Sequence, residues 1–88
     1  MTGAVLVLTT VGPRFDAVGL AKTLVERGLA SCVNVLPGVT SVYRWEGAIK
    51  SEPEQQLIIK TLTERVVALE AAMRSRIDRA RTKTRAAA

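Results

Sequence analysis

In the first third of the chain, an apolar run is followed by an amphipathic segment. Residues 4–11 are hydrophobic on both faces and rich in β-branched side chains, and Gly12 and Pro13 follow them. This pattern predicts a central β-strand. Hydrophobic residues then recur at steps of three and four as far as Leu29, with charged residues between them. The spacing predicts an amphipathic helix from about Arg14 to near Gly28.

The middle of the chain has the alternating pattern of two long strands. Residues 31–45 alternate in polarity except at Pro37 and Gly38, which indicate a bend or bulge within one strand. A turn at Glu46 and Gly47 and a second strand over residues 55–62 predict an antiparallel hairpin. Residues 48–54 suit either further pairing or a loop.

The last hydrophobic stripe predicts a second helix. It begins at Thr61, which forms a capping-box pattern with Glu64, and it runs to about Arg81. The stripe consists of Leu62, Val66, Leu69, Met73, Ile77 and Ala80. The hydrophobic stripe of this helix does not continue into residues 82–88, and we expect these residues to form a frayed tail.

The element order β-α-β-β-α predicts an α+β protein of the ferredoxin-like class whose usual fourth strand is missing. Residues 1–81 would form one domain, and residues 82–88 a basic tail. Without the fourth strand, one edge of the first strand would stay open unless another chain covered it.

Charge is concentrated at the end of the chain. Residues 1–70 hold seven basic and seven acidic side chains, whereas residues 71–88 hold six basic and one acidic, which accounts for the net charge of +5. No aromatic residue lies among these cations, so they favour nonspecific electrostatics or a solvated helix end over a specific nucleic-acid site.

Several function classes are excluded or disfavoured by composition. The sequence has no histidine, which excludes histidine-based acid–base catalysis, and we predict no enzymatic activity. It also lacks the run of about 18 apolar residues that a transmembrane helix needs. The single cysteine excludes an internal disulfide, and no basic residue precedes the first apolar run. We therefore expect a cytoplasmic protein without a membrane partner.

Four residues are candidates for ligand contacts. Cys32, the only thiol, could bind a soft ion such as Cu(I) with Met73 or with symmetry-related cysteines, or it could be a small buried hydrophobe. Tyr43 and Trp45 could form a ligand surface or a subunit contact. Lys60 could reach a cleft or simply extend into solvent. The acidic residues around Pro53 are expected to be solvated surface.

A long motif in the middle of the chain resembles the signature of the CutA family of divalent-cation tolerance proteins. Residues 30–47 read ASCVNVLPGVTSVYRWEG, and the resemblance extends to residues 9–10 (TT), 21–25 (AKTLV) and 57–61 (LIIKT). It covers about residues 4–76. The resemblance implies a ferredoxin-like subunit in a homotrimer whose long strands pair between subunits.

The resemblance also implies a function. CutA proteins contribute to tolerance of copper and other divalent ions, with no established reaction and no obligatory cofactor. Cys32 corresponds to the metal contact proposed for the family, and residues like Tyr43, Trp45 and Lys60 line its inter-subunit cleft. The alternative is a trimeric regulatory module that binds a small ligand in that cleft.

The C-terminus departs from the family pattern. CutA proteins follow the second helix with a His-Pro-Tyr-Glu-Val-Pro-Glu type of segment, a strand and a short helix. After Arg76 this chain reads IDRAR and ends at Ala88, without the family's histidine. By this resemblance the chain lacks a metal contact of the family, together with the family's final strand and terminal helix.

Overall fold

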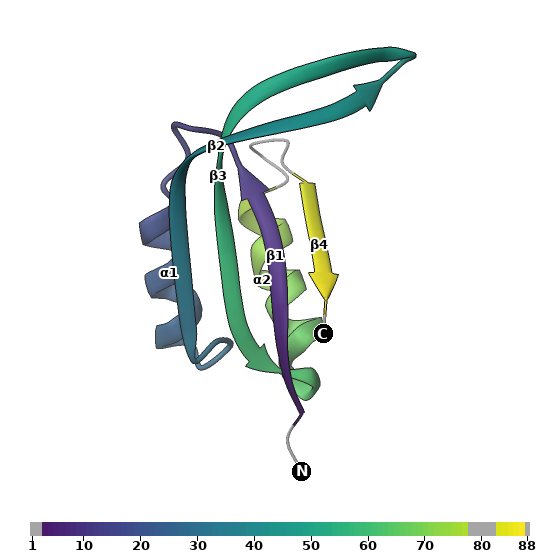
Figure 1. The fold of residues 1–88 in the computed structure, drawn as a ribbon. Coiled ribbons are helices and arrows are strands. Elements are labelled where there is room, and N and C mark those ends of the chain that lie inside the picture. Colours follow the sequence, from purple (N-terminus) through teal and green to yellow (C-terminus); the bar gives the residue numbers. More distant parts are fainter. Residues whose placement is uncertain (1–2, 78–82, 88) are drawn as a thin grey trace.

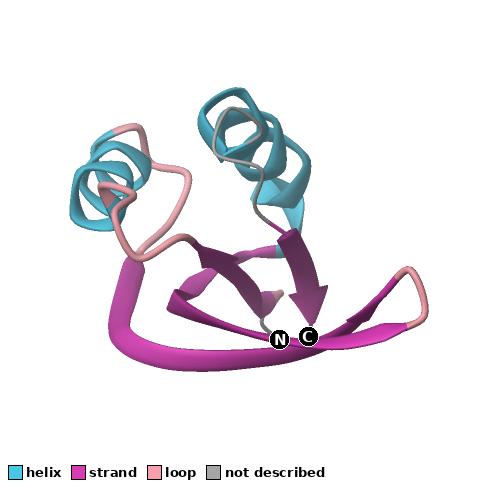
Figure 2. Cartoon of the chain, turned by 90° about the horizontal axis from the view of Figure 1, so that it is seen from above, coloured by secondary structure: helices cyan, strands magenta, loops and turns pink. Residues whose placement is uncertain are grey.

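The chain forms two layers, a four-stranded sheet with two helices packed on one of its faces (Figures 1 and 2). The computed structural model describes residues 3–77 and 83–87. The elements are β1 (Ala4–Val11), α1 (Ala17–Glu26), β2 (Cys32–Trp45), β3 (Ala48–Leu62), the 3₁₀ turn η1 (Thr63–Arg65), α2 (Val66–Ile77) and β4 (Lys83–Ala87). The predicted α+β class and its β-α-β-β-α order are confirmed.

All neighbouring strands are antiparallel, in the spatial order β2-β3-β1-β4. Alternate residues of the central strands face the helices and are fully buried between the two layers. The largest of these core side chains are Leu20, Leu24, Leu57, Ile59, Leu69, Met73, Val7 and Val11. Figure 2 shows both helices on the same side of the sheet, so neither of the described helices covers the other side.

The prediction of a missing fourth strand is wrong. β4 pairs with β1 from Leu6, opposite Ala87, to Thr10, opposite Lys83, and so covers the edge that we expected to be open. Of the expected frayed tail, residues 82 and 88 lie outside the described residues, and the segment between them is this strand. Edge pairing uses backbone groups, which every residue carries, so it needs no hydrophobic alternation.

The first helix begins three residues later than predicted, because Asp16 caps it. The Asp16 carboxylate accepts a hydrogen bond from the Gly19 amide at 3.0 Å. Its C-terminal end matches the prediction near Gly28, where φ is +69°. The Gly28 amide donates to the Val25 carbonyl, and the Leu29 amide donates to the Leu24 carbonyl, which is the Schellman pattern.

The capping box predicted at Thr61 is also wrong. Thr61 is a buried residue of β3, and its hydroxyl donates to the Leu29 carbonyl at 2.7 Å. The strand continues to Leu62, so the second helix starts only after η1. A threonine that anchors a buried strand and one that caps a helix look alike in sequence, since both need only a hydroxyl near a turn.

The β2–β3 hairpin extends well beyond the sheet, and Figure 1 shows its end projecting away from the other strands. We call residues 39–54 the arm. Residues 48–54 are paired rather than looped, and the predicted bulge lies between Leu36 and Val39. At the tip, Glu46 and Gly47 have φ values of 49° and 80°. Two consecutive positive φ angles are typical of the tight turn that joins antiparallel strands.

Candidate functional site

The sheet face opposite the helices brings the predicted metal residue next to one of the predicted cleft residues. We call it the helix-free face. Cys32 pairs directly with Lys60, and Lys60 pairs with Leu6 on its other side. Side chains opposite each other on one sheet face have Cβ atoms about 5 Å apart. Strand pairing therefore places a thiol, an ammonium group and an aliphatic side chain in one row.

Cys32 is a free, half-buried thiol on this face. Met73 cannot join it, because that side chain is only 1% exposed in the core on the helix side of the sheet. Among the described residues no group of three cysteine or acidic side chains could hold a metal ion. Within residues 3–77 of one chain, Cys32 is thus the only sulfur ligand on the helix-free face.

Tyr43 and Trp45 lie on the arm and share its face with the row of Cys32. Two residues of β2, Pro37 and Gly38, lie opposite the single residue Gln55 of β3. This extra residue puts the odd-numbered positions after the bulge on the same face as the even-numbered positions before it. Alternation alone would have placed Tyr43 on the opposite face from Cys32.

The arm keeps Tyr43 far from Lys60 within one chain. Tyr43 pairs with Lys50, which precedes Lys60 by ten residues on β3. At the rise of an extended strand this corresponds to about 30 Å. The predicted cleft of Tyr43, Trp45 and Lys60 is therefore not formed inside one chain and stays a prediction for an assembly.

A hollow of about 320 Å³, lined by both polar and apolar side chains, lies at the base of the arm. Its walls come from β1, β2 and β3 and consist of Leu8, Thr9, Thr10, Ser41, Val42, Tyr43, Glu54 and Gln56. The Tyr43 hydroxyl also donates a hydrogen bond to Glu52. Sequence reasoning placed the acidic residues around Pro53 on the solvated surface and missed the half-buried Glu54. Glu54 lies on β3 directly before the residues that pair with β1, and it shares the hollow with Thr9 and Thr10.

No helix in the described part of the chain is long and apolar enough to cross a membrane.

The family model and the similar sequences that match this chain all belong to CutA proteins. The family model for the CutA1 divalent ion tolerance protein matches residues 5–81. The divalent-cation tolerance protein CutA of Thermus thermophilus is 48% identical over 58 residues, which are 66% of this chain and 56% of that protein. The CutA homolog of Xenopus laevis is 48% identical over 56 residues, 64% of this chain and 37% of that protein. The matched part thus spans about half or less of these relatives.

Solved structures match over nearly the whole chain. The divalent cation tolerance protein of Thermus thermophilus has a TM-score of 0.86 at 35% identity, covering 97% of this chain and 82% of that one. CutA from Synechococcus elongatus has a TM-score of 0.84 at 40% identity, covering 98% and 76%. The backbone likeness therefore extends beyond the segments that align in sequence. On the family match and these likenesses together, the chain belongs to the CutA1 divalent ion tolerance protein family.

Proposed function

We propose that this chain acts as a homotrimer that binds copper through Cys32 and contributes to tolerance of divalent metal ions in the cytoplasm. The observation that carries the proposal is the position of the only thiol, half-buried on a sheet face that neither described helix covers. Thiolates select soft ions such as Cu(I), and a reducing compartment keeps a single cysteine free to bind them. The proposal includes no catalytic step.

The trimer is supported by apolar surface that a single chain leaves uncovered. Leu6 and Leu36 on the helix-free face are 42% and 38% exposed. On the arm, Val42, Trp45 and Ile49 are 67%, 55% and 63% exposed. Patches of this kind mark protein contact surfaces, and aromatic residues are enriched there. A neighbouring copy could also bring its Tyr43 and Trp45 to the Lys60 end of the sheet.

The first test is the native mass in solution. We expect a trimer for the wild-type chain and smaller species for Ile58→Arg, which puts a charge in the middle of the helix-free face next to Leu8 and Asn34. Val67→Arg is the matched control, because Val67 lies on α2 and is 82% exposed. Analytical ultracentrifugation would measure both variants. A trimer that tolerates Ile58→Arg would contradict this interface.

The metal site needs more than one chain. One thiolate makes an incomplete copper site, and the described residues of one chain add no second sulfur on that face. Three symmetry-related Cys32 side chains would supply three thiolates. The three Lys60 side chains beside them would offset the negative charge that such a cluster accumulates.

The second test is a titration with Cu(I) under anaerobic conditions. We expect one copper ion per three chains and loss of this binding in Cys32→Ser. Asn34→Ala, two positions along the same strand and on the same face, should bind as the wild type does. Competition with a chromogenic chelator gives the stoichiometry. Equal binding by Cys32→Ser would remove Cys32 as a ligand.

A second candidate function is small-ligand binding at the base of the arm. The hollow there carries hydroxyl groups and the Glu54 carboxylate, which suits an amine that bears hydroxyl groups. One similar structure, CutA from Synechococcus elongatus, is described as a complex with Bis-Tris, and CutA from Nostoc is described as a PII-like protein. A melting temperature raised by Bis-Tris but not by copper would favour this function over metal binding.

A further inference from the structure

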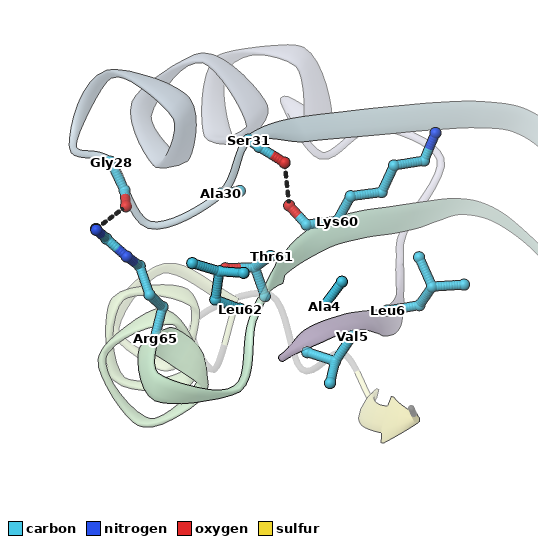
Figure 3. Close-up of a pocket in the computed structure, with 10 residues that line it drawn as sticks. All are labelled: Ala4, Val5, Leu6, Gly28, Ala30, Ser31, Lys60, Thr61, Leu62 and Arg65. Atoms are coloured by element: carbon cyan, nitrogen blue, oxygen red, sulfur yellow. Dashed lines mark hydrogen bonds between the residues drawn. The ribbon is translucent and has the colours of Figure 1, made fainter. Parts of the chain in front are cut away.

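The connection between α1 and β2 leads directly into Cys32 and is tied to the end of β3 and to η1. The Thr61 hydroxyl donates a buried hydrogen bond to the Leu29 carbonyl at 2.7 Å. The Arg65 guanidinium donates to the Gly28 carbonyl, as Figure 3 shows. Two consecutive carbonyls of the connection are thus held by side chains of β3 and η1. The connection is therefore fixed in position relative to the strand that it runs beside.

Ser31, the last residue of this connection, is bound twice to β3 (Figure 3). Its amide donates to the Lys60 carbonyl at 2.9 Å, and its hydroxyl donates to the same oxygen at 3.0 Å. A carbonyl oxygen has two lone pairs, so it can accept both bonds. We call this pair of bonds the clasp. Lys60 is also the strand partner of Cys32, so the clasp fixes the backbone directly before the thiol.

Cys32 lies at a corner of the sheet, where few backbone contacts hold it. It is the first residue of β2, and β2 is an edge strand among the described strands. The first residue of a strand frays more easily than the middle, because paired residues follow it but none precede it. Pairing with β3 holds Cys32 on one side only. The clasp therefore supplies a constraint that the strand ladder does not provide at this position.

A second clasp of the same kind lies at the same end of the sheet. The Thr63 amide and hydroxyl both donate to the Gly3 carbonyl at 2.8 Å. This contact joins the residue before β1 to the residue after β3. Neither of these residues is a sequence neighbour or a strand partner of Cys32. The chain thus makes the same pair of bonds twice, once beside the thiol and once away from it.

We propose that Ser31 is a positioning residue of the copper site, holding the Cys32 thiol where three copies of it meet on one ion. This inference rests on the copper function proposed above. A metal site requires its ligands to be held within about 0.5 Å of the productive geometry. Because three chains contribute one thiolate each, a displacement caused by loss of the clasp would act three times on the same ion. Copper would then have to order the three thiols on binding, which lowers its affinity.

The test is anaerobic Cu(I) titration of Ser31→Ala, which removes the hydroxyl bond of the clasp and keeps the amide bond. We expect an affinity at least about tenfold weaker than that of the wild type, because one hydrogen bond is lost in each of three chains. The stoichiometry should stay at one copper ion per three chains. Ser31→Thr keeps the hydroxyl and should restore wild-type affinity. Thr63→Ala is the matched control, because it removes the hydroxyl from the second clasp, and it should bind copper as the wild type does.

X-ray absorption at the copper edge separates positioning of the thiol from a general loss of stability. The wild type and Thr63→Ala should show three sulfur ligands at one distance, and Ser31→Ala should show unequal distances. Wild-type affinity in Ser31→Ala, or equal weakening in Thr63→Ala, would overturn the role of Ser31. If Cys32→Ser loses copper while Ser31→Ala binds it normally, the copper function stands and this inference fails. Unchanged binding by Cys32→Ser would overturn the copper function and this inference with it.

Discussion

Replacing Gln55 with glutamate is expected to lower the free energy of unfolding by about 3 kcal/mol at neutral pH. The Gln55 amide nitrogen donates two hydrogen bonds, both at 2.9 Å, to the carbonyl oxygens of Gly12 and Phe15. These bonds tie β3 to the connection between β1 and α1. A carboxylate of the same size would lose both donors and face the two carbonyl oxygens with a negative charge.

The loss of unfolding free energy in this variant should be larger at neutral pH than at acidic pH. In the Gln55→Glu variant, the facing carbonyls favour the protonated acid, so the pKa of the introduced carboxyl group is raised in the folded state above its unfolded value. Below the unfolded pKa of about 4.3 the protonated acid can still donate one of the two hydrogen bonds, so part of the stability is retained there. That part is lost as pH rises through the higher folded pKa.

Gln56→Glu is the matched control for that variant. It makes the same substitution at the next residue, on the helix-free face, and should cost less than about 1 kcal/mol. Urea unfolding of both variants at one fixed protein concentration, at acidic and neutral pH, would measure the difference. Equal destabilisation of the two variants would contradict the role of Gln55.

Ile59→Ala is expected to destabilise the chain by about 2–5 kcal/mol, the usual range for truncating a buried isoleucine. Ile59 is fully buried on β3 between β1 and β2, in the core beneath the helices. The truncation would leave a cavity in the core, because β3 is held in place by pairing with β1 on one side and β2 on the other.

The arm offers a control of the same residue type on the same strand. Ile49 is 63% exposed, so Ile49→Ala should cost the isolated chain less than about 0.5 kcal/mol. Chemical denaturation at low protein concentration would compare the two. A larger loss for Ile49→Ala that grows with protein concentration would indicate that the arm is buried in an assembly.

Elements with strong hydrophobic periodicity could be predicted from the sequence. The central strands, the amphipathic helix and the hairpin follow from the alternation of apolar residues and from Glu46 and Gly47 at the turn. Boundaries were less predictable, because they depend on contacts distant in sequence. Thr61 is held in β3 by its bond to Leu29, which a local pattern cannot reveal.

The last strand and the sites were the least predictable. β4 pairs through backbone groups, and its sequence KTRAA has no hydrophobic alternation. Cys32 and Lys60 meet because the hairpin register pairs residues 28 positions apart. The hollow at the base of the arm is lined by residues of three strands that are far apart in the sequence, which a local pattern does not reveal.

Because of the bulge, the direction in which the arm points can change without changing the face on which the arm side chains lie. A one-residue slip of the whole hairpin would turn every arm side chain to the other face. Loss of one of the two residues opposite Gln55 would leave Val39 paired with Glu54 and would remove only the local bend. Single-residue deletions at this point could therefore re-aim the arm in related proteins while its binding residues keep facing the same way.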